Sequence, residues 1–292
     1  MFALLRTIRP RQWVKNVFVA APIVFSRHLE DRGYLVREAI AVLAFCLVSG
    51  AVYAFNDVRD VAADRLHPTK KHRPIAAGEL SERAALASAI VLAVVAIAGC
   101  VAVRWQLAVW TTVYAAQNIA YSVRLKHVAF VDVLLLTSGF LLRVLAGAAA
   151  IDVPPSGWLL VCTGLIALLL GLGKRAHELA WARSSGGPNT TATRAALSGY
   201  RLEVVRPAMY VLAVATCAAY AAYTLDAHTV ELFGTRDLIY STPFVALGIA
   251  RFLSLALWAP RIDSPTDAML RDPWFMLDLI AATATVLYII YG

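Results

Sequence analysis

Long apolar runs separated by short polar segments make up most of the chain. A membrane-spanning helix needs about 20 mostly apolar residues, and nine runs approach or exceed that length. No run alternates strictly between apolar and polar positions, so a transmembrane barrel is excluded and an all-α fold is predicted. The nine expected spans are 12–27, 37–58, 83–104, 106–122, 128–151, 156–180, 204–224, 237–259 and 272–291.

The composition fits an integral membrane protein. Of the 292 residues, 60% are apolar and only 16% are charged, and the mean hydropathy is +0.67. Soluble domains are about 45–50% apolar and about 25% charged. These values exclude a soluble enzyme, a disordered chain and a nucleic-acid-binding domain with a basic face. Because neither an internal repeat nor a separate soluble region is apparent, residues 1–292 are predicted to form one transmembrane catalytic domain.

The distribution of basic residues predicts the orientation in the membrane. If the N-terminus is cytoplasmic, 20 of the 27 Lys and Arg residues fall on the inner side and 5 on the outer side. Cytoplasmic loops carry the excess of Lys and Arg in membrane proteins. We therefore expect a multi-pass protein of the plasma membrane whose most polar end faces the cytoplasm.

An acidic motif, Asn56-Asp57-x-x-Asp60-x-x-x-Asp64, follows the second expected span. On one continuous helix its three carboxylates would share an arc of about 60°, where they repel each other unless a cation lies between them. Mg²⁺ commonly joins one or two carboxylates to substrate phosphates. The motif therefore predicts a catalytic Mg²⁺ site. A solvated helix end whose acids pair with Arg59 and Arg65 is the alternative.

Basic and polar residues at the same predicted end of the spans suit a substrate with several phosphates, which Lys and Arg would bind beside the metal. The alternative is that these charges fix the orientation or contact anionic lipid. The candidate substrate-binding residues are Lys15, Tyr53, Arg73, Tyr121, Ser122, Lys126, Asp132, Lys174, Arg175 and Glu178.

Arg143 is the most deeply placed charge of the predicted site. It follows Asp132 by 11 residues, which is about 16 Å along a helix. Ionisable groups at such depth are costly and are functional candidates by default. We expect Arg143 to bind substrate or to form an internal ion pair, and in either case to meet a polar or charged partner inside the helix bundle.

These motifs resemble the UbiA superfamily of intramembrane prenyltransferases. The family signature N-D-x-x-D-x-x-x-D is matched by Asn56, Asp57, Asp60 and Asp64, and the basic loop with Arg73-Pro74 and Gly78 is also similar. The resemblance covers essentially the whole chain. It implies nine transmembrane helices around a central cavity that is open to lipid.

The second acidic signature of ordinary members, D-x-x-x-D, is replaced here by Tyr121-Ser122-x-x-Leu125-Lys126 and the single Asp132. This departure resembles one branch of the family, as do Trp13-x-Lys15-Asn16, Gly139-Phe140-x-x-Arg143 and Gly173-Lys174-Arg175-x-x-Glu178. Membership of that branch implies transfer of 5-phosphoribose from phosphoribosyl diphosphate (PRPP) to decaprenyl phosphate. The product would feed arabinan synthesis for the cell wall.

Two other functions remain open at this point. An ordinary prenyltransferase of the same fold would transfer a prenyl group from its diphosphate to an aromatic acceptor. A transporter for a phosphorylated solute would be expected to show two related halves with interrupted spans, and the sequence shows no such symmetry. The sequence also leaves the oligomeric state and the length of the lipid acceptor open.

Overall fold

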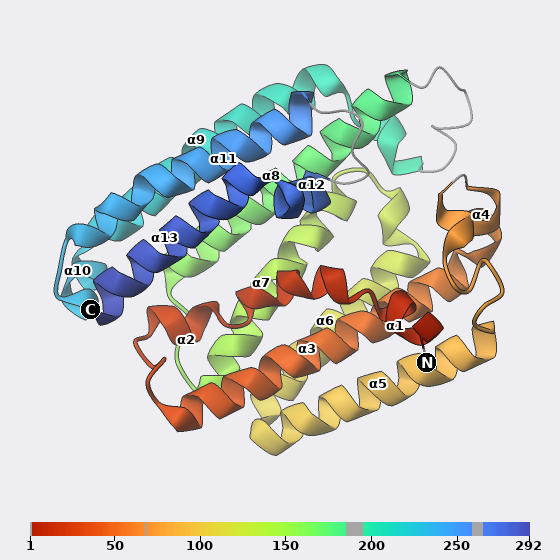
Figure 1. Cartoon of the computed structure of the whole chain (residues 1–292), viewed down its shortest axis with the longest axis horizontal. Coiled ribbons are helices and arrows are strands. Elements are labelled where there is room, and N and C mark those ends of the chain that lie inside the picture. Colours follow the sequence, from red (N-terminus) through yellow and green to blue (C-terminus); the bar gives the residue numbers. More distant parts are fainter. Residues whose placement is uncertain (1, 68, 185–194, 259–264) are drawn as a thin grey trace. The chain divides into compact units, whose positions relative to one another are not determined.

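The computed structural model describes residues 2–67, 69–184, 195–258 and 265–292, and all regular structure within them is helical (Figure 1). This confirms the predicted all-α class. The chain forms two compact units: the N-terminal unit comprises Met1–Leu125 and Ser138–Pro155, and the C-terminal unit comprises Lys126–Thr137 and Ser156–Gly292. Helix α7 (Val131–Ile151) begins in the C-terminal unit and ends in the N-terminal unit.

The N-terminal unit is built around α3 (Arg32–Arg59), which packs along α5 (Glu82–Val103) and α6 (Trp105–Val123). Figure 1 shows α3 and α5 side by side. Phe45, Val48 and Leu107 belong to its buried core. The shorter elements are α1 (Phe2–Ile8), η1 (Pro10–Phe18), α2 (Ala21–Phe25), α4 (Val61–Leu66) and η2 (Lys70–His72). The short element η3 (Leu125–His127) crosses into the C-terminal unit after Leu125.

Side-chain caps fix where the two longest helices of this unit begin. The Asp31 carboxylate accepts hydrogen bonds from the backbone N–H groups of Gly33 and Tyr34 at the start of α3. Ser81 accepts one from the N–H of Ala84 at the start of α5. Such caps satisfy N–H groups that have no partner within the helix.

The C-terminal unit contains three further long helices after α8 (Gly157–Ser184): α9 (Leu202–Leu225), α11 (Thr242–Trp258) and α13 (Pro273–Tyr291). Helix α8 packs on α9, and α11 contacts α8, α9 and α13. Leu169, Met209 and Phe252 are part of its core. The short elements are η4 (Ala195–Gly199), α10 (Ala227–Phe233), η5 (Asp237–Ser241) and α12 (Pro265–Arg271).

Within the described residues, seven helical segments are long and apolar enough to span a membrane, so the protein is a multi-pass membrane protein, but the expected count of nine is not confirmed. The expected span 106–122 does form one helix, α6. It is less apolar than the seven because it carries Gln106, Gln117 and Asn118. The seven segments are Arg32–Arg59, Glu82–Val103, Val131–Ile151, Gly157–Ala180, Leu202–Leu225, Asp237–Trp258 and Pro273–Tyr291.

The expected first span, 12–27, is wrong as a single helix. The chain forms a 3-10 helix over Pro10–Phe18, turns, and starts a second short helix at Ala21. Pro22 occupies the first turn of that second helix. A proline has no N–H for the preceding turn and is favoured where a helix begins.

Candidate active site

The acidic motif spans two helices rather than one. Helix α3 ends at Arg59, Asp60 is the residue at the break, and α4 begins at Val61. The expectation of one continuous helix through Asp57, Asp60 and Asp64 is therefore wrong at Asp60. An aspartate competes with helical hydrogen bonding by offering its own side chain to nearby backbone groups, so it suits the end of a helix better than its interior.

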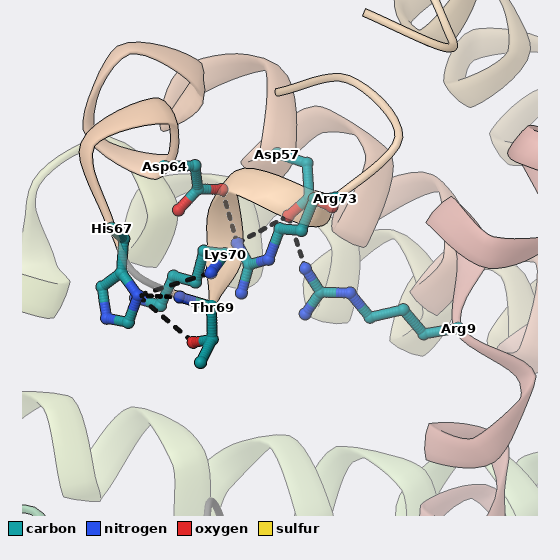
Figure 2. A network of polar contacts seen from close by, with 7 residues as sticks. All are labelled: Arg9, Asp57, Asp64, His67, Thr69, Lys70 and Arg73. Atoms are coloured by element: carbon teal, nitrogen blue, oxygen red, sulfur yellow. Dashed lines mark hydrogen bonds and ion pairs between the residues drawn. The ribbon is translucent and has the colours of Figure 1, made fainter. Parts of the chain in front are cut away.

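An arginine nevertheless brings two of these acids together (Figure 2). One guanidinium nitrogen of Arg73, Nη1, lies 3.1 Å from Oδ1 of Asp57 and 2.6 Å from Oδ2 of Asp64. Arg9 reaches the same Asp57 oxygen at 2.5 Å from the N-terminal side. Both acids are buried, whereas the Arg9 and Arg73 side chains are about a quarter exposed, at 27% and 26%. In this structure, arginines provide the positive charge that the acidic motif requires.

The geometry of the acids fits a metal ion that also binds substrate oxygens. Across residues 2–67, 69–184, 195–258 and 265–292, no three Asp, Glu, His or Cys side chains converge closely enough to hold a metal by themselves. Asp57 and Asp64 both contact the Arg73 guanidinium. Asn56 and Asp60, which belong to the same motif, are half-buried. Because Mg²⁺ usually takes only one or two carboxylates and completes its shell with water and phosphate oxygens, this donor set suits it.

His67 organises the loop that carries Arg73. Its Nδ1 accepts hydrogen bonds from the backbone N–H groups of Thr69 at 3.3 Å and Lys70 at 3.4 Å (Figure 2). Burial, followed by the nearby charge of Lys70, lowers the pKa of His67 below its ordinary value of 6.5. The neutral ring that these contacts require is therefore also the form that the surroundings favour.

Arg143 has several polar partners inside the N-terminal unit, as expected from its depth. Its guanidinium donates to Oδ1 of Asn16 at 2.9 Å, to the hydroxyl of Tyr114 at 2.8 Å and to the carbonyl of Gly139 at 2.8 Å. It also lies over the Tyr114 ring, 4.6 Å from the centroid. All the contacts found for this guanidinium in the described part of the chain are with neutral groups.

Four more candidates lie in the N-terminal unit. Tyr53 is one turn before Asp57 on α3, and the Arg9 guanidinium lies over its ring at 5.2 Å. Lys15 is half-buried on η1, while Tyr121 and the buried Ser122 lie at the end of α6. The structure thus places these residues in the same unit as the acidic motif.

The remaining candidates belong to the C-terminal unit, and three of them form a second ionic cluster. Asp132 and Arg175 are both fully buried, with Oδ2 of Asp132 2.8 Å from Nε of Arg175. Arg175 also pairs with Glu178, one turn later on α8. Lys126 on η3 and Lys174 on α8 are half-buried.

The sequence alone missed two residues of these clusters. The Tyr200 hydroxyl donates to Oδ1 of Asp132 at 2.6 Å and accepts from the N–H of Phe130 at 2.8 Å. Burial and the neighbouring Asp132 raise the pKa of Tyr200. The other missed residue is Arg9, whose basic side chain at the predicted cytoplasmic end was the available signal.

Comparison with known proteins identifies the family. The model of the UbiA prenyltransferase family matches residues 33–268. The chain therefore belongs to the UbiA prenyltransferase family. Its fold agrees: the structure of a UbiA homolog from Archaeoglobus fulgidus bound to GPP and Mg²⁺ has a TM-score of 0.73 at 17% identity, covering 99% of this chain and 100% of that one.

Curated relatives narrow the comparison to one branch. The chain is 36% identical over 293 residues to the decaprenyl-phosphate phosphoribosyltransferase of Mycobacterium tuberculosis, covering 97% of this chain and 92% of the relative. It is 32% identical to the protein of the same name from Mycolicibacterium smegmatis, covering 99% and 92%. The resemblance stated from the motifs is thereby confirmed across almost the whole length.

Proposed function

We propose that this protein transfers 5-phosphoribose from PRPP to a polyprenyl phosphate, with decaprenyl phosphate as the expected acceptor, and releases diphosphate. The observation that carries the proposal is the identity of 32–36% to decaprenyl-phosphate phosphoribosyltransferases over almost their full length. The departure of the second motif supports it, because Lys126 stands where ordinary members carry an acid. PRPP has two separate phosphate groups and so suits a site richer in cations than one for a prenyl diphosphate.

In this reaction the bond between C1 of the ribose and the diphosphate oxygen breaks, and the diphosphate leaves with the electron pair. An oxygen of the lipid phosphate forms the new bond to C1 from the opposite face, which gives a β-linked product. The lipid phosphate is already an anion, so no general base is required. Catalysis then depends on positioning and on stabilising the leaving charge.

The acidic motif and the two arginines have different proposed roles at the diphosphate: the acids bind the metal and the arginines contact phosphate oxygens. Asp57 and Asp64, with Asn56 and Asp60, would hold Mg²⁺, which when bound neutralises charge on the leaving diphosphate. Arg9 and Arg73 lie at the acids and can donate to phosphate oxygens in the bidentate manner typical of arginine. Metal and guanidinium groups together would bind the leaving group more strongly as its charge develops.

The other candidates are proposed as substrate contacts in two groups. In the N-terminal unit, Lys15, Tyr53, Tyr121 and Ser122 would contact donor hydroxyls or phosphate groups, and Arg143 would contact the phosphate of the lipid acceptor. In the C-terminal unit, Lys126 and Lys174 would contact phosphate, while Asp132 and Glu178 would orient Arg175, which they contact.

The polar end of the spans is proposed to face the cytoplasm, where PRPP is available, with the lipid acceptor entering sideways from the inner leaflet. Lys71 is exposed in the basic loop after the motif. In a background without the native cysteines, Lys71→Cys should be protected from an impermeant maleimide in intact cells and labelled after lysis. Thr235→Cys, on the opposite predicted side, is the matched control. Labelling of Lys71→Cys in intact cells would reverse the orientation.

A donor-swap assay tests the function itself. Purified protein is incubated with Mg²⁺, decaprenyl phosphate and PRPP labelled in the ribose, and label should move into the organic phase with stoichiometric release of diphosphate. Transfer from a prenyl diphosphate to an aromatic acid, without transfer from PRPP, would instead make the chain an ordinary prenyltransferase. Adding excess EDTA should stop the reaction if Mg²⁺ is required.

A further inference from the structure

Two arginines meet on one carboxylate oxygen of the acidic motif. Oδ1 of Asp57 lies 2.5 Å from Arg9 and 3.1 Å from Arg73. The Arg73 nitrogen that contacts Asp57 is also the one that contacts Asp64, at 2.6 Å. This nitrogen therefore occupies the position between two buried acids that a shared cation would take. Burying such acids without compensation is costly.

A metal ion bound by the same acids cannot simply be added to this arrangement. Mg²⁺ binds oxygens at about 2.0–2.1 Å, so a metal that bridges the acids through Oδ1 of Asp57 and Oδ2 of Asp64 requires direct access to the two oxygens that the guanidinium groups now contact. It would also bring two positive charges to a place where two arginines already face two acids. A metal that takes this bridging position displaces at least one guanidinium from these oxygens.

The acids and the arginines differ in how easily they can move. Asp57 lies within the long helix α3 and is 2% exposed. Arg73 follows the short element η2, Arg9 precedes η1, and both side chains keep about a quarter of their surface exposed. Asp57 is thus the fixed partner and the two arginines are the movable ones. A displaced guanidinium needs a new anion, and the donor diphosphate supplies one.

We propose that Arg9 and Arg73 are stand-in cations, which hold the metal-binding acids in the free protein and exchange onto the diphosphate when metal and donor bind. The exchange rests on the proposed function for the identity of its diphosphate ligand. It makes binding of metal and diphosphate cooperative, because each ligand removes the obstacle to the other. The exchange also predicts opposite changes in two affinities. Loss of an arginine should raise the affinity for metal alone and lower the affinity for diphosphate.

The test uses the full-length protein in detergent, with Mn²⁺ as the metal probe and inorganic pyrophosphate as the anion probe. Mn²⁺ binding is followed by loss of the free-ion EPR signal, and binding of labelled pyrophosphate is measured separately at fixed Mn²⁺. The variants are Arg73→Gln and Arg9→Gln. Arg65→Gln is the matched control, because Arg65 is an exposed arginine of the same region, 4.0 Å from Glu82. Asp57→Asn reports whether the bound Mn²⁺ is at this site.

We expect Arg73→Gln to bind Mn²⁺ alone about tenfold more tightly than the unmodified protein, which corresponds to one lost charge-assisted hydrogen bond. The same variant should bind pyrophosphate at least about tenfold more weakly. Arg9→Gln should shift both in the same directions by less, because Arg73 still contacts both acids. Arg65→Gln should change neither, and Asp57→Asn should abolish Mn²⁺ binding.

Unchanged or weaker Mn²⁺ binding in both arginine variants would overturn the exchange, and so would Mn²⁺ binding that survives Asp57→Asn. If Arg73→Gln fails to fold without metal, recovery of its thermal stability by Mn²⁺ supports the exchange. If it fails to fold in both conditions, Arg9→Gln decides. The donor-swap assay separates the two proposals: no transfer from PRPP with the expected Mn²⁺ shifts refutes only the function, and transfer without those shifts refutes only the exchange.

Discussion

The two ionic clusters of this protein contain the same groups in different settings. In the N-terminal unit, the buried acids Asp57 and Asp64 meet an arginine that is 26% exposed and that comes from a loop. In the C-terminal unit, Asp132 and Arg175 are both 0% exposed and lie on helices α7 and α8. The first cluster can exchange its cation with the surroundings, whereas the Asp132–Arg175 pair is closed and only its further partner Glu178 is partly exposed, at 26%. The open cluster below is Asp57, Asp64 and Arg73, and the closed cluster is the pair Asp132 and Arg175.

Solvent access explains why these clusters should have different roles. A fully buried ion pair gives little net stability but becomes strongly destabilising when one partner is removed. The bond from Tyr200 to Asp132 adds a further fixed contact. We therefore assign ligand binding to the open cluster and a positioning role to the closed one, and the following predictions compare them.

The largest effect is expected for Asp57→Asn, on turnover. The change removes a metal ligand and a stabiliser of the leaving charge, and loss of a single such stabiliser costs about 10²–10³ in rate. We expect a loss beyond that range at nearly unchanged thermal stability, because Arg73 still pairs with Asp64. Transfer of labelled phosphoribose and thermal unfolding in detergent measure the two quantities. A near-normal rate would remove the metal role from Asp57.

The closed cluster should respond in the opposite way to the same type of change. Asp132→Asn leaves the buried Arg175 without its full counter-charge, and breaking a buried pair costs about 3–5 kcal/mol. We expect a large drop in the unfolding temperature. Adding Arg175→Met should restore much of it, since an apolar pair avoids the buried charge. A stable Asp132→Asn variant with a raised KM for PRPP would show that the closed cluster also binds substrate.

Motifs made of neighbouring residues were easier to predict from the sequence than contacts between residues that are far apart along the chain. Hydropathy identified the long helices but not the interruption between Phe18 and Ala21, because it measures composition and not backbone hydrogen bonding. The acidic motif was found by its spacing, although the helix is interrupted at Asp60. Arg9 and Asp57 are 48 residues apart, and only the folded chain brings them together, so no local pattern could select Arg9 among the basic residues.

Arg143 is a buried arginine whose contacts within the described residues are all with neutral groups, and its variants show whether it binds ligand like the open cluster or supports packing like the closed one. If it contacts the acceptor phosphate, Arg143→Met should raise the KM for decaprenyl phosphate about tenfold, on the scale of one charge-assisted hydrogen bond, with little change in the KM for PRPP. Tyr114→Phe, which removes one partner of Arg143, is a milder control. Loss of stability without a change in either KM would make Arg143 a packing residue.

The smallest effect concerns the loop that makes the open cluster adjustable. The pKa of His67 is lowered in the folded protein, so the unfolded chain takes up the proton first. The loop's stability is therefore fully present above pH 6.5 and is lost as the pH falls through the folded-state pKa. Protonated Nδ1 cannot accept from the N–H groups of Thr69 and Lys70. The groups with charges around it are Lys70, Asp64 and Arg73.

We expect the amide protection factors of Thr69 and Lys70, measured by hydrogen exchange, to fall as the pH is lowered from about 7.5 to about 5.5. Protonation of a histidine ring begins within this range of pH. His67→Asn supplies a side-chain oxygen that accepts a hydrogen bond but does not titrate, so its protection should vary less over this range. The closed cluster provides the internal reference, because the backbone N–H of Val133, bonded to Asp132 at 2.9 Å, should keep its protection. Equal loss of protection at Val133 would mean that low pH destabilises the whole fold. The effect would then not be confined to the loop that carries His67 and Arg73.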